Sequence, residues 1–172
     1  DRKYDEIYII RAASKNKLGD YKGAVADSSK AIKLNYKNTT AYFISGQAKK
    51  SLGDYKGSIE DFTKAIKIEP LYAEAYDDRG MAKVKIKDYT GAINDYTKAI
   101  ELKPNLDHAL NNRGKAKYDL NDYTGAINDF NKAIAINPLN WSNYRHRGIA
   151  KHSLGDYEGA IQDANRALEI DN

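Results

Sequence analysis

Apolar and small residues recur every three or four positions along much of the chain, with charged and polar residues between them. This spacing places one apolar stripe along one face of an α-helix, and such a stripe is expected to be buried against a neighbouring element. The clearest example lies within residues 52–70, which are therefore predicted to contain an amphipathic helix. Its apolar or small positions are Ser58, Ile59, Phe62, Ala65 and Ile66.

Versions of this stretch recur four more times, starting at Leu18, Ile86, Leu120 and Leu154. Each start lies 34 residues from the next, and a fixed period of this size is typical of stacked helical repeats. In such a protein each repeat contacts only its neighbours, so the chain has no single core. With position 1 of each repeat at Asp5, Thr39, Ala73, Asp107 and Trp141, repeats one to five span residues 5–38, 39–72, 73–106, 107–140 and 141–172.

Each repeat is predicted to contain two helices. The first covers positions 2 to 14, and the second starts after the aspartate of a Gly-Asp-Tyr turn, whose short acceptor side chain suits a helix N-cap. Proline at position 32 is expected to end the second helix, because its ring prevents further helical hydrogen bonding. Glycine at position 8 costs about 1 kcal/mol relative to alanine inside a helix. We expect it to face alanine-rich positions of the partner helix, where two backbones approach.

The columns of repeat two match a known pattern of aromatic, glycine, alanine and proline positions. Because this pattern occurs five times, the chain resembles the tetratricopeptide repeat (TPR) family, and the wording Asp-Tyr-x-Gly-Ala-Ile resembles its bacterial members. The resemblance implies an all-α, right-handed superhelical solenoid of five helix-turn-helix units, forming one array over residues 1–172. The matching residues are Tyr42, Gly46, Leu52, Gly53, Asp54, Tyr55, Phe62, Ala65 and Pro70, with Ser58 in place of the family's alanine.

Three columns that are usually apolar in the family are ionic in this chain. Position 7 is arginine except at Ser45 in repeat two, position 11 is always lysine, and position 23 is always aspartate. A partly buried charge is tolerated when it is paired and hydrogen-bonded. We therefore predict that each aspartate at position 23 pairs with a basic residue of its own or an adjacent repeat, in a structural and not a catalytic role.

The two end repeats lack the aromatic residue that occupies position 24 inside the array. Repeats two, three and four carry Phe62, Tyr96 and Phe130 there, whereas the ends carry Ser28 and Ala164. Ala164 indicates that little packs beyond repeat five, since end repeats have a single neighbour. Ser28, together with Tyr36 in the proline column, predicts a weak point between repeats one and two.

In TPR arrays the first helices line a concave groove in which peptide segments of other proteins bind, and positions 2, 5, 6, 9 and 12 face inward. The resemblance implies an apolar floor in repeats one and two, an acidic stretch in repeat three, and amide-rich and then basic stretches in repeats four and five. The inward residues are Ile9, Ile10, Ala13, Phe43, Ile44, Gln47, Glu74, Asp77, Asp78, Met81, His108, Asn111, Asn112, Lys115, Tyr118, Arg145, His146, Ile149 and His152.

These residues predict a partner segment with apolar side chains at repeats one and two, a basic group near Asp77 and Asp78, and an acidic group near Arg145. Asn111 and Asn112 are expected to bind its backbone through their side-chain amides. A different interpretation is that the apolar residues contact neighbouring helices or an N-terminal segment outside this sequence. The alternative function is self-assembly or intramolecular packing through the apolar surface of repeats one and two. In the first of these cases the chain would form a homo-oligomer.

One known family site, the carboxylate clamp for chaperone tails, is not expected. It requires Lys at position 5 and Asn at 9 of one repeat, Asn at 6 of the next, and Lys at 2 and Arg at 6 of the third. Starting from repeat three, only Asn112 matches.

Composition excludes several other functions. The net charge is +4, from 28 basic and 24 acidic residues, and the lysines are spread over all repeats, so nucleic-acid binding is not expected. Zero cysteines exclude disulfides. No run of eighteen apolar residues predicts a membrane span. The compartment is left open, with the cytoplasm favoured over the periplasm, because a targeting segment outside this sequence would leave no trace.

No catalytic, cofactor or metal site is expected either. Two histidines at groove positions, His108 and His146, lack a third ligand at a defined spacing. The carboxylates Glu74, Asp77 and Asp78 would lie in an open groove, where no desolvation separates their pKa values for acid–base catalysis. The sequence therefore predicts a non-enzymatic scaffold for protein–protein interaction.

Overall fold

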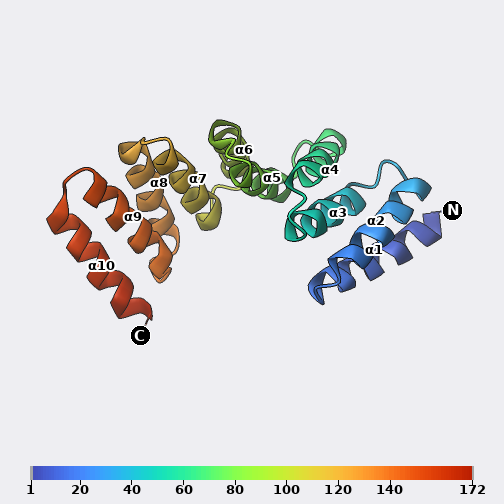
Figure 1. Cartoon of the computed structure of the whole chain (residues 1–172), viewed down its shortest axis with the longest axis horizontal. Helices are drawn as coiled ribbons and strands as arrows, with labels where there is room; N and C mark the ends of the chain where they lie inside the picture. Colours follow the sequence, from blue (N-terminus) through green and yellow to red (C-terminus); the bar gives the residue numbers. More distant parts are fainter. Residues whose placement is uncertain (1, 172) are drawn as a thin grey trace. The chain divides into compact units, whose positions relative to one another are not determined.

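The computed structural model describes residues 2–171, and within them all regular secondary structure is α-helical. Each helix packs against the next along the chain within its unit (Figure 1), which confirms the predicted all-α helical-repeat fold. No helix within residues 2–171 combines the length and apolar character needed to cross a membrane. The helices are α1 (Arg2–Lys17), α2 (Tyr21–Leu34), α3 (Thr39–Ser51), α4 (Tyr55–Ile68), α5 (Ala73–Lys85), α6 (Tyr89–Leu102), α7 (Asp107–Asp119), α8 (Tyr123–Ile136), α9 (Trp141–Ser153) and α10 (Tyr157–Asp171).

The helices group into two compact units. Unit 1 spans Asp1–Lys87 and contains α1 to α5, and unit 2 spans Asp88–Asn172 and contains α6 to α10. In unit 1 the first helices of successive repeats also touch, α1 with α3 and α3 with α5, and in unit 2 α7 touches α9. The division lies inside repeat three, between its two helices. That the five repeats form a single array with a right-handed superhelix remains a prediction.

The helix boundaries recur at nearly the same positions in each repeat. The aspartate before each second helix accepts a hydrogen bond from the glycine N–H three residues later, for example Gly57 N to Asp54 Oδ1 at 3.0 Å. This confirms the predicted N-caps. The residue at position 15, just after the first helix, has a positive φ in every repeat, including Lys87 (φ 64°) and Asn121 (φ 63°). The turn therefore imposes a left-handed conformation even where glycine is absent, at a steric cost to those two residues.

Proline is not what ends the second helix. α2 ends at Leu34, in the same column as α4, α6 and α8, although repeat one has Tyr36 in place of proline. In each case the capping residue at position 31 is near-extended, as Asn35 is with φ −145° and ψ 91°, and its N–H donates to the alanine carbonyl four residues before. Proline reinforces this end, because it disfavours helical geometry in the residue that precedes it.

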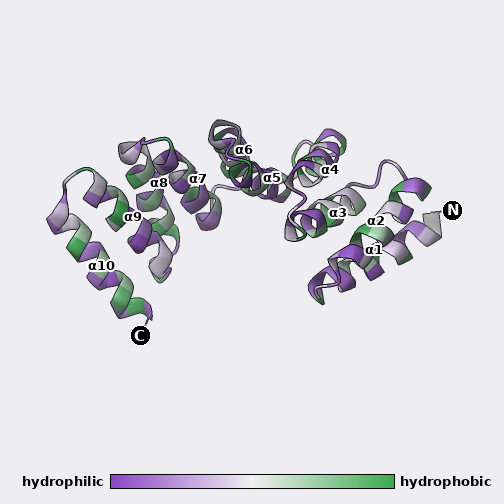
Figure 2. Ribbon diagram, in the orientation of Figure 1, coloured by the Kyte–Doolittle hydropathy of each residue, from purple (hydrophilic) through white to green (hydrophobic). Residues whose placement is uncertain are grey.

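The core consists of alanines that let helices approach and one aromatic ring at position 24. Phe62 and Phe130 are at most 1% exposed, and Phe130 packs with the fully buried Ala126 and Ala150. The hydropathy colouring of Figure 2 shows the resulting stripes of apolar residues along the helices. The buried ring, and not the partner backbone, explains glycine at position 8 in repeats two and four. A Cβ added to Gly114 would lie 2.7 Å from the Phe130 ring.

A network of ion pairs joins the two helices of repeats one, two, four and five. In unit 2 Asp129 accepts hydrogen bonds from Nε and Nη2 of Arg113, at 2.9 and 2.7 Å, and its Oδ2 lies 2.8 Å from Lys117 Nζ. The same arrangement holds Asp27 between Arg11 and Lys15, and Asp163 between Arg147 and Lys151. In repeat two Asp61 is held by Lys49 and by the hydroxyl of Ser45. The predicted pairing is thus confirmed for these four repeats.

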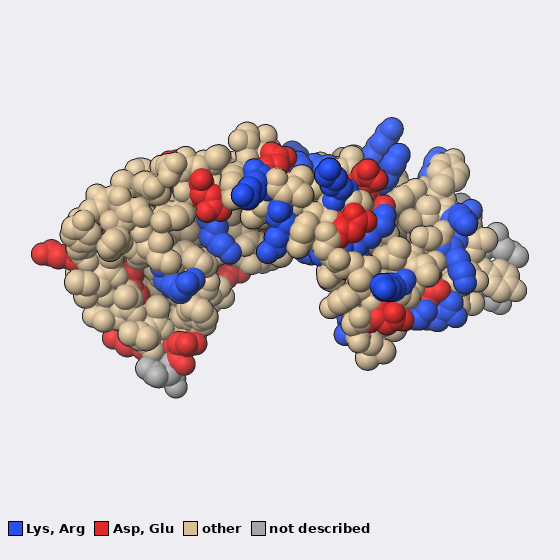
Figure 3. All heavy atoms as spheres, in the orientation of Figure 1, with Lys and Arg blue, Asp and Glu red and all other residues tan. Residues whose placement is uncertain are grey.

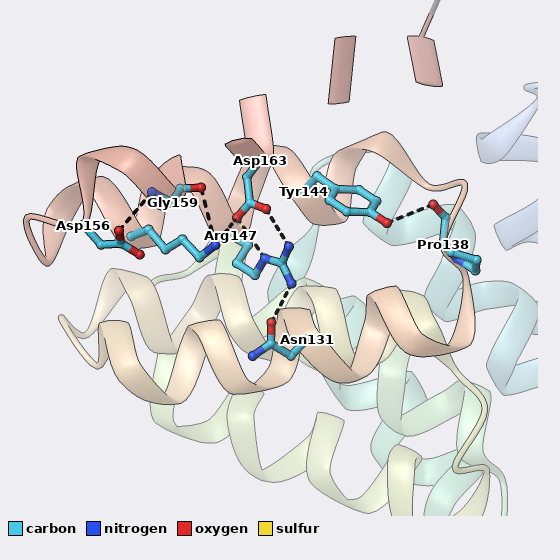
Figure 4. A network of polar contacts seen from close by, with 8 residues as sticks. Asn131, Pro138, Tyr144, Arg147, Asp156, Gly159 and Asp163 are labelled. Atoms are coloured by element: carbon cyan, nitrogen blue, oxygen red, sulfur yellow. Dashed lines mark hydrogen bonds and ion pairs between the residues drawn. The ribbon is translucent and has the colours of Figure 1, made fainter. Parts of the chain in front are cut away.

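The arginine at position 7 also connects its repeat to the preceding one. Its remaining nitrogen, Nη1, donates to the side chain at position 25 of that repeat: Arg79 to Thr63, Arg113 to Thr97 and Arg147 to Asn131. Figure 4 shows Arg147 between Asp163 of its own repeat and Asn131 of the preceding one. Repeat two has Ser45 at this position, so the junction of α2 and α3 lacks the arginine. This gives the predicted weak point between repeats one and two a further physical basis.

We expect Asp129→Ala to lower the free energy of unfolding by about 3–5 kcal/mol, the usual effect of removing one partner of a buried ion pair. Asp129 is 1% exposed, and its loss leaves Arg113 and Lys117 without their carboxylate. Denaturant unfolding followed by circular dichroism measures the change. The control Glu169→Ala breaks the exposed pair with Arg166 and should cost less than about 1 kcal/mol. Equal losses in both variants would contradict the structural role of the network.

Gly114→Ala is expected to destabilise the protein despite the better helix propensity of alanine. The added methyl group would force the Phe130 ring to move, and overpacking of this kind costs about 1–3 kcal/mol. Gly148→Ala is the matched control, because the nearest atom to its added Cβ lies at 3.3 Å and repeat five has no ring at position 24. Thermal melting of both variants tests this fit, and a larger loss in Gly148→Ala would refute it.

Candidate functional site

The inward positions of unit 1 differ in how much of each side chain reaches solvent. Ile10 is the most open, at 67% exposed, and Glu74 and Met81 are also exposed. Ile44 and Asp77 are each 6% exposed. The expectation that these two line an open face is therefore wrong, because the packing of the helices covers them. The half-buried members are Ile9, Ala13, Phe43, Gln47 and Asp78.

The repeat-two part of the predicted apolar floor belongs to the core, since Ile44 is buried and Phe43 packs inside the unit. The Phe43 ring lies 5.7 Å from the Phe62 ring and 4.8 Å from the Tyr72 ring, measured between centroids. It packs against the cluster of Ala65, Ile66 and Ala75. The alternative interpretation, contact with neighbouring helices, is confirmed for Phe43.

The acidic stretch of repeat three is partly neutralised by repeat two. Asp78 accepts hydrogen bonds from Lys50 Nζ at 2.5 Å and from Gln47 Nε2 at 2.9 Å, and both donors lie on α3. A basic group of a partner would have to displace Lys50 to reach this carboxylate. Glu74 is the exposed carboxylate of this stretch.

In unit 2 the inward face of α7 and α9 is more open. His108, Lys115 and Arg145 are exposed, and Asn112 and His146 are half-buried. Asn111 is only 8% exposed, and its Nδ2 donates to Asn143 Oδ1 at 2.6 Å. The expectation that Asn111 binds a partner backbone is therefore wrong, because its amide holds α7 to α9.

Between α7 and α9 lies a small hollow of about 140 Å³, which we call the α7–α9 hollow. Its floor is aromatic, since the ring of Phe130 stacks on that of His146 with the centroids 5.8 Å apart. One basic and one acidic residue lie on its wall. The lining residues are Lys115, Tyr118, Asp119, Phe130, His146 and Ile149.

A larger and mostly apolar cavity of about 570 Å³ lies between α9 and α10, and we call it the α9–α10 cavity. Sequence reasoning missed it, although Ala164 opposite Gly148 was the signal that could have found it. In repeats two and four a ring at position 24 fills the corresponding space. The lining residues are Tyr118, Trp141, Arg145, Gly148, Ile149, His152, Ser153, Ala160, Ala164, Ala167, Leu168 and Asp171.

Burial shifts the charge state of the one histidine in the α7–α9 hollow. Loss of solvent around His146, with smaller effects of the nearby charges of Lys115 and Arg145, lowers its pKa to about 4. His146 is therefore neutral at pH 7, and the positive charge predicted for this face comes from Lys115 and Arg145. Within residues 2–171 no three His, Asp or Glu side chains converge in a way that could hold a metal ion.

The pKa values of Asp27 and Asp163 in the ion-pair network are lowered, whereas burial alone would raise the pKa of an acid. Hydrogen bonds from Arg11 and Lys15 hold the pKa of Asp27 far below its usual range. Burial would raise the pKa of Asp163, but hydrogen bonds from Arg147 and Lys151 bring it below its ordinary value. Both groups therefore stay ionised at neutral pH, as a structural ion pair requires.

The low pKa of His146 predicts a loss of stability in mild acid. Its contribution is fully present above the ordinary histidine value of about 6.5 and is lost as the pH falls towards about 4, because the unfolded chain binds the proton more readily. In His146→Gln the melting temperature should fall less between pH 7 and pH 5 than in the wild type. The control His152→Gln changes an exposed histidine and should keep the wild-type dependence. An unchanged dependence in His146→Gln would contradict this assignment.

Comparison with known proteins agrees with the repeat structure. A tetratricopeptide repeat model matches residues 39–70 and 144–172, and a TPR repeat model matches residues 80–121 and 114–155. No curated protein matches the sequence. The crystal structure of MamA is 26% identical, with a TM-score of 0.88, and the match covers 93% of this chain and 94% of that one.

Two further structures share the fold at lower identity. Residues 41 to the end of MamA from Desulfovibrio magneticus RS-1 are 20% identical, with a TM-score of 0.91 and coverage of 98% of this chain and 95% of that chain. YrrB, described as a TPR protein with an unusual peptide-binding site, is 21% identical, with a TM-score of 0.82 and coverage of 95% and 84%. Because the two family models together match most of the sequence, the chain belongs to the tetratricopeptide repeat family, a family of protein-interaction scaffolds.

Proposed function

We propose that this protein is a non-enzymatic scaffold whose inward face on α7 and α9 binds a peptide segment of a partner protein. The observation that carries the proposal is the α7–α9 hollow, an aromatic-floored depression beside two exposed basic residues, Lys115 and Arg145. An apolar side chain can enter such a hollow, while polar groups around it fix the orientation of the segment. The peptide-binding site named for YrrB agrees with this use of the fold.

Two exposed basic residues, Lys115 and Arg145, outweigh the one exposed acidic residue of the lining, Asp119, and this favours a partner segment with carboxylates beside its apolar residue. Lys115 and Arg145 are exposed, and neutral His146 leaves room for an apolar side chain against its ring. Asn112 is half-buried and is the remaining candidate for a hydrogen bond to the partner backbone. Arg145 also lines the α9–α10 cavity, so Lys115 is the cleaner position at which to test this site.

In unit 1 the exposed inward residues Ile10, Glu74 and Met81 are the proposed contacts. Asp77 is buried, so its charge reversal would disturb the fold and would not test binding. Self-assembly is the second candidate function. It is favoured by the exposure of Ile7 (53%) and Ile10 (67%) on α1, since exposed apolar patches mark interaction surfaces.

We expect Lys115→Glu to weaken peptide binding about tenfold, corresponding to about 1.4 kcal/mol. Peptides selected from a random display library on the wild-type chain should combine acidic with aliphatic or aromatic residues. Their affinity for wild type and variant is measured by fluorescence polarisation at low and high salt, because salt screens exposed charges.

Lys132→Glu makes the same charge change on the exposed surface of α8 and should leave the affinity unchanged. Selected peptides without acidic residues, or equal binding by the Lys115 variant, would overturn the proposed site.

A further inference from the structure

In every later first helix, one face packs on the preceding repeat and is buried. The corresponding residues of α1, among them Ile7, Ile10 and Ser14, are exposed, and we call this the α1 face. Position 3, occupied by fully buried alanine in α3, α5 and α7, is Ile7 in α1 and is 53% exposed. Position 10 is fully buried alanine in α3, α5, α7 and α9, but is Ser14 and exposed in α1. The side chain of Arg11 is 52% exposed, compared with 18% for Arg147. In later repeats this face packs on the preceding repeat.

The residues of repeat five at the positions on which the next repeat packs elsewhere in the chain include Ala164, Ala167 and Leu168. We call this surface the α9–α10 face. Leu168, at position 28, is 63% exposed, whereas Ile66 at the same position of repeat two is 9% exposed and packs with Ala75 of repeat three. The α9–α10 cavity opens on this face, because Ala164 stands where Phe130 fills the corresponding space in repeat four.

The two faces are complementary in volume. Contacts between neighbouring repeats pair position 3 with positions 27 and 28, as Ala75 pairs with Ala65 and Ile66, and pair position 6 with position 24, as His146 pairs with Phe130. Applied to the α1 face and the α9–α10 face, these rules bring the large Ile7 to Ala167 and Leu168, and the large Ile10 to the small Ala164. The α1 face has bulk where interior repeats have alanine, and the α9–α10 face has a cavity where they have a ring.

Two further contacts between neighbouring repeats also have counterparts. Position 9 meets position 6 of the next repeat, as Gln47 meets Asp78, and this rule brings together Ile149 and Ile10, which are both aliphatic. Position 25 accepts from the arginine at position 7 of the next repeat, as Asn131 accepts from Arg147. Asn165 occupies position 25 of repeat five and is exposed, while Nη1 of Arg11 has no hydrogen-bond partner within residues 2–171.

The net charges of α1 and α10 have opposite signs. α1 contains five basic and two acidic residues, whereas α10 contains four acidic residues and one basic residue. Arg11, Lys15 and Asp163 among them already form ion pairs inside their own repeats, and the difference in sign remains when they are left out. In Figure 3 the surface over α9 and α10 is mostly uncharged, with acidic side chains near the C-terminal end of α10, and basic side chains gather over α1 and α2. Such complementarity favours the pairing of one face with the other over the pairing of either face with itself.

We propose that a second copy of this chain covers the α9–α10 face with its α1 face, so that copies join head to tail and Ile10 of one copy enters the α9–α10 cavity of the next. Each junction then continues the repeat stacking from one chain to another. A heterologous interface of this kind builds open chains or closed rings, not dimers related by a two-fold axis. This goes beyond the binding of a partner peptide and gives the self-assembly alternative a definite geometry.

Light scattering of the eluting protein, measured over a wide range of concentration, should show an average mass that rises past that of a dimer. Ile10→Glu places a charge on the α1 face at an exposed position, and Ala164→Phe fills the cavity with the residue used in repeat four. Leu168→Glu is a second way to block the α9–α10 face. Each variant should weaken association about tenfold or more, with an unchanged circular dichroism spectrum.

Mixing provides the decisive measurement. Ile10→Glu retains an intact α9–α10 face, and Ala164→Phe retains an intact α1 face, so an equimolar mixture should form a one-to-one complex that does not grow further. Leu139→Glu, which changes a 70% exposed leucine between α8 and α9, should assemble like the wild type. Lys115→Glu should also assemble normally, which separates this proposal from peptide binding at the α7–α9 hollow.

Three outcomes would overturn the proposal. A wild-type chain that stays monomeric at every concentration would mean that something other than a second copy covers these faces. Assembly that survives both Ala164→Phe and Leu168→Glu but is lost in Ile10→Glu would show that two α1 faces pair with each other. A mixture of the two blocked variants that remains monomeric would exclude the head-to-tail junction.

Discussion

The packing of the two helices in repeats one, four and five depends on a buried aspartate at position 23 that is held by an arginine and a lysine from the first helix of the same repeat. Burying a carboxylate is unfavourable unless its oxygens are paired, so the three ionic columns must occur together. The arginine has a further nitrogen that reaches the preceding repeat, as Arg113 reaches Thr97 and Arg147 reaches Asn131. The same arginine thereby contributes both to the packing within its repeat and to the contact with the preceding repeat.

The second constraint is steric, and it links the interior of the stack to its ends. A ring at position 24 requires glycine at position 8, as Gly46 and Gly114 show. Repeat five keeps Gly148 but has Ala164 in place of the ring, and the α9–α10 cavity results. Small residues at both position 8 and position 24 therefore leave an apolar cavity that a neighbouring element can cover. The absence of one side chain thus determines where the molecule can make a new contact.

The inward faces of the two units differ in how many polar and aromatic side chains are already used in contacts between helices. In unit 1 the carboxylate of Asp78 accepts hydrogen bonds from Lys50 and Gln47, and the ring of Phe43 packs against the core. In unit 2 Lys115 and Arg145 remain exposed beside a hollow, while Asn111 is used to join two helices. Residues that hold adjacent repeats together are not free to bind a partner, and this leaves α7 and α9 as the more open face.

The sequence alone determined the helices, their period and the ionic pairing, because these follow from local spacing and from the repetition of the same columns. Only the tertiary structure decided which inward side chains are accessible. Position 6 is buried at Ile44 and half-buried at Asp78, and position 5 is buried at Asn111 and exposed at Arg145, so the column does not fix the environment. Burial of these side chains depends on the size and hydrogen bonding of residues on the neighbouring repeats. The charge of His146 was likewise decided by the packing around it, because desolvation depends on the surroundings and not on the residue type.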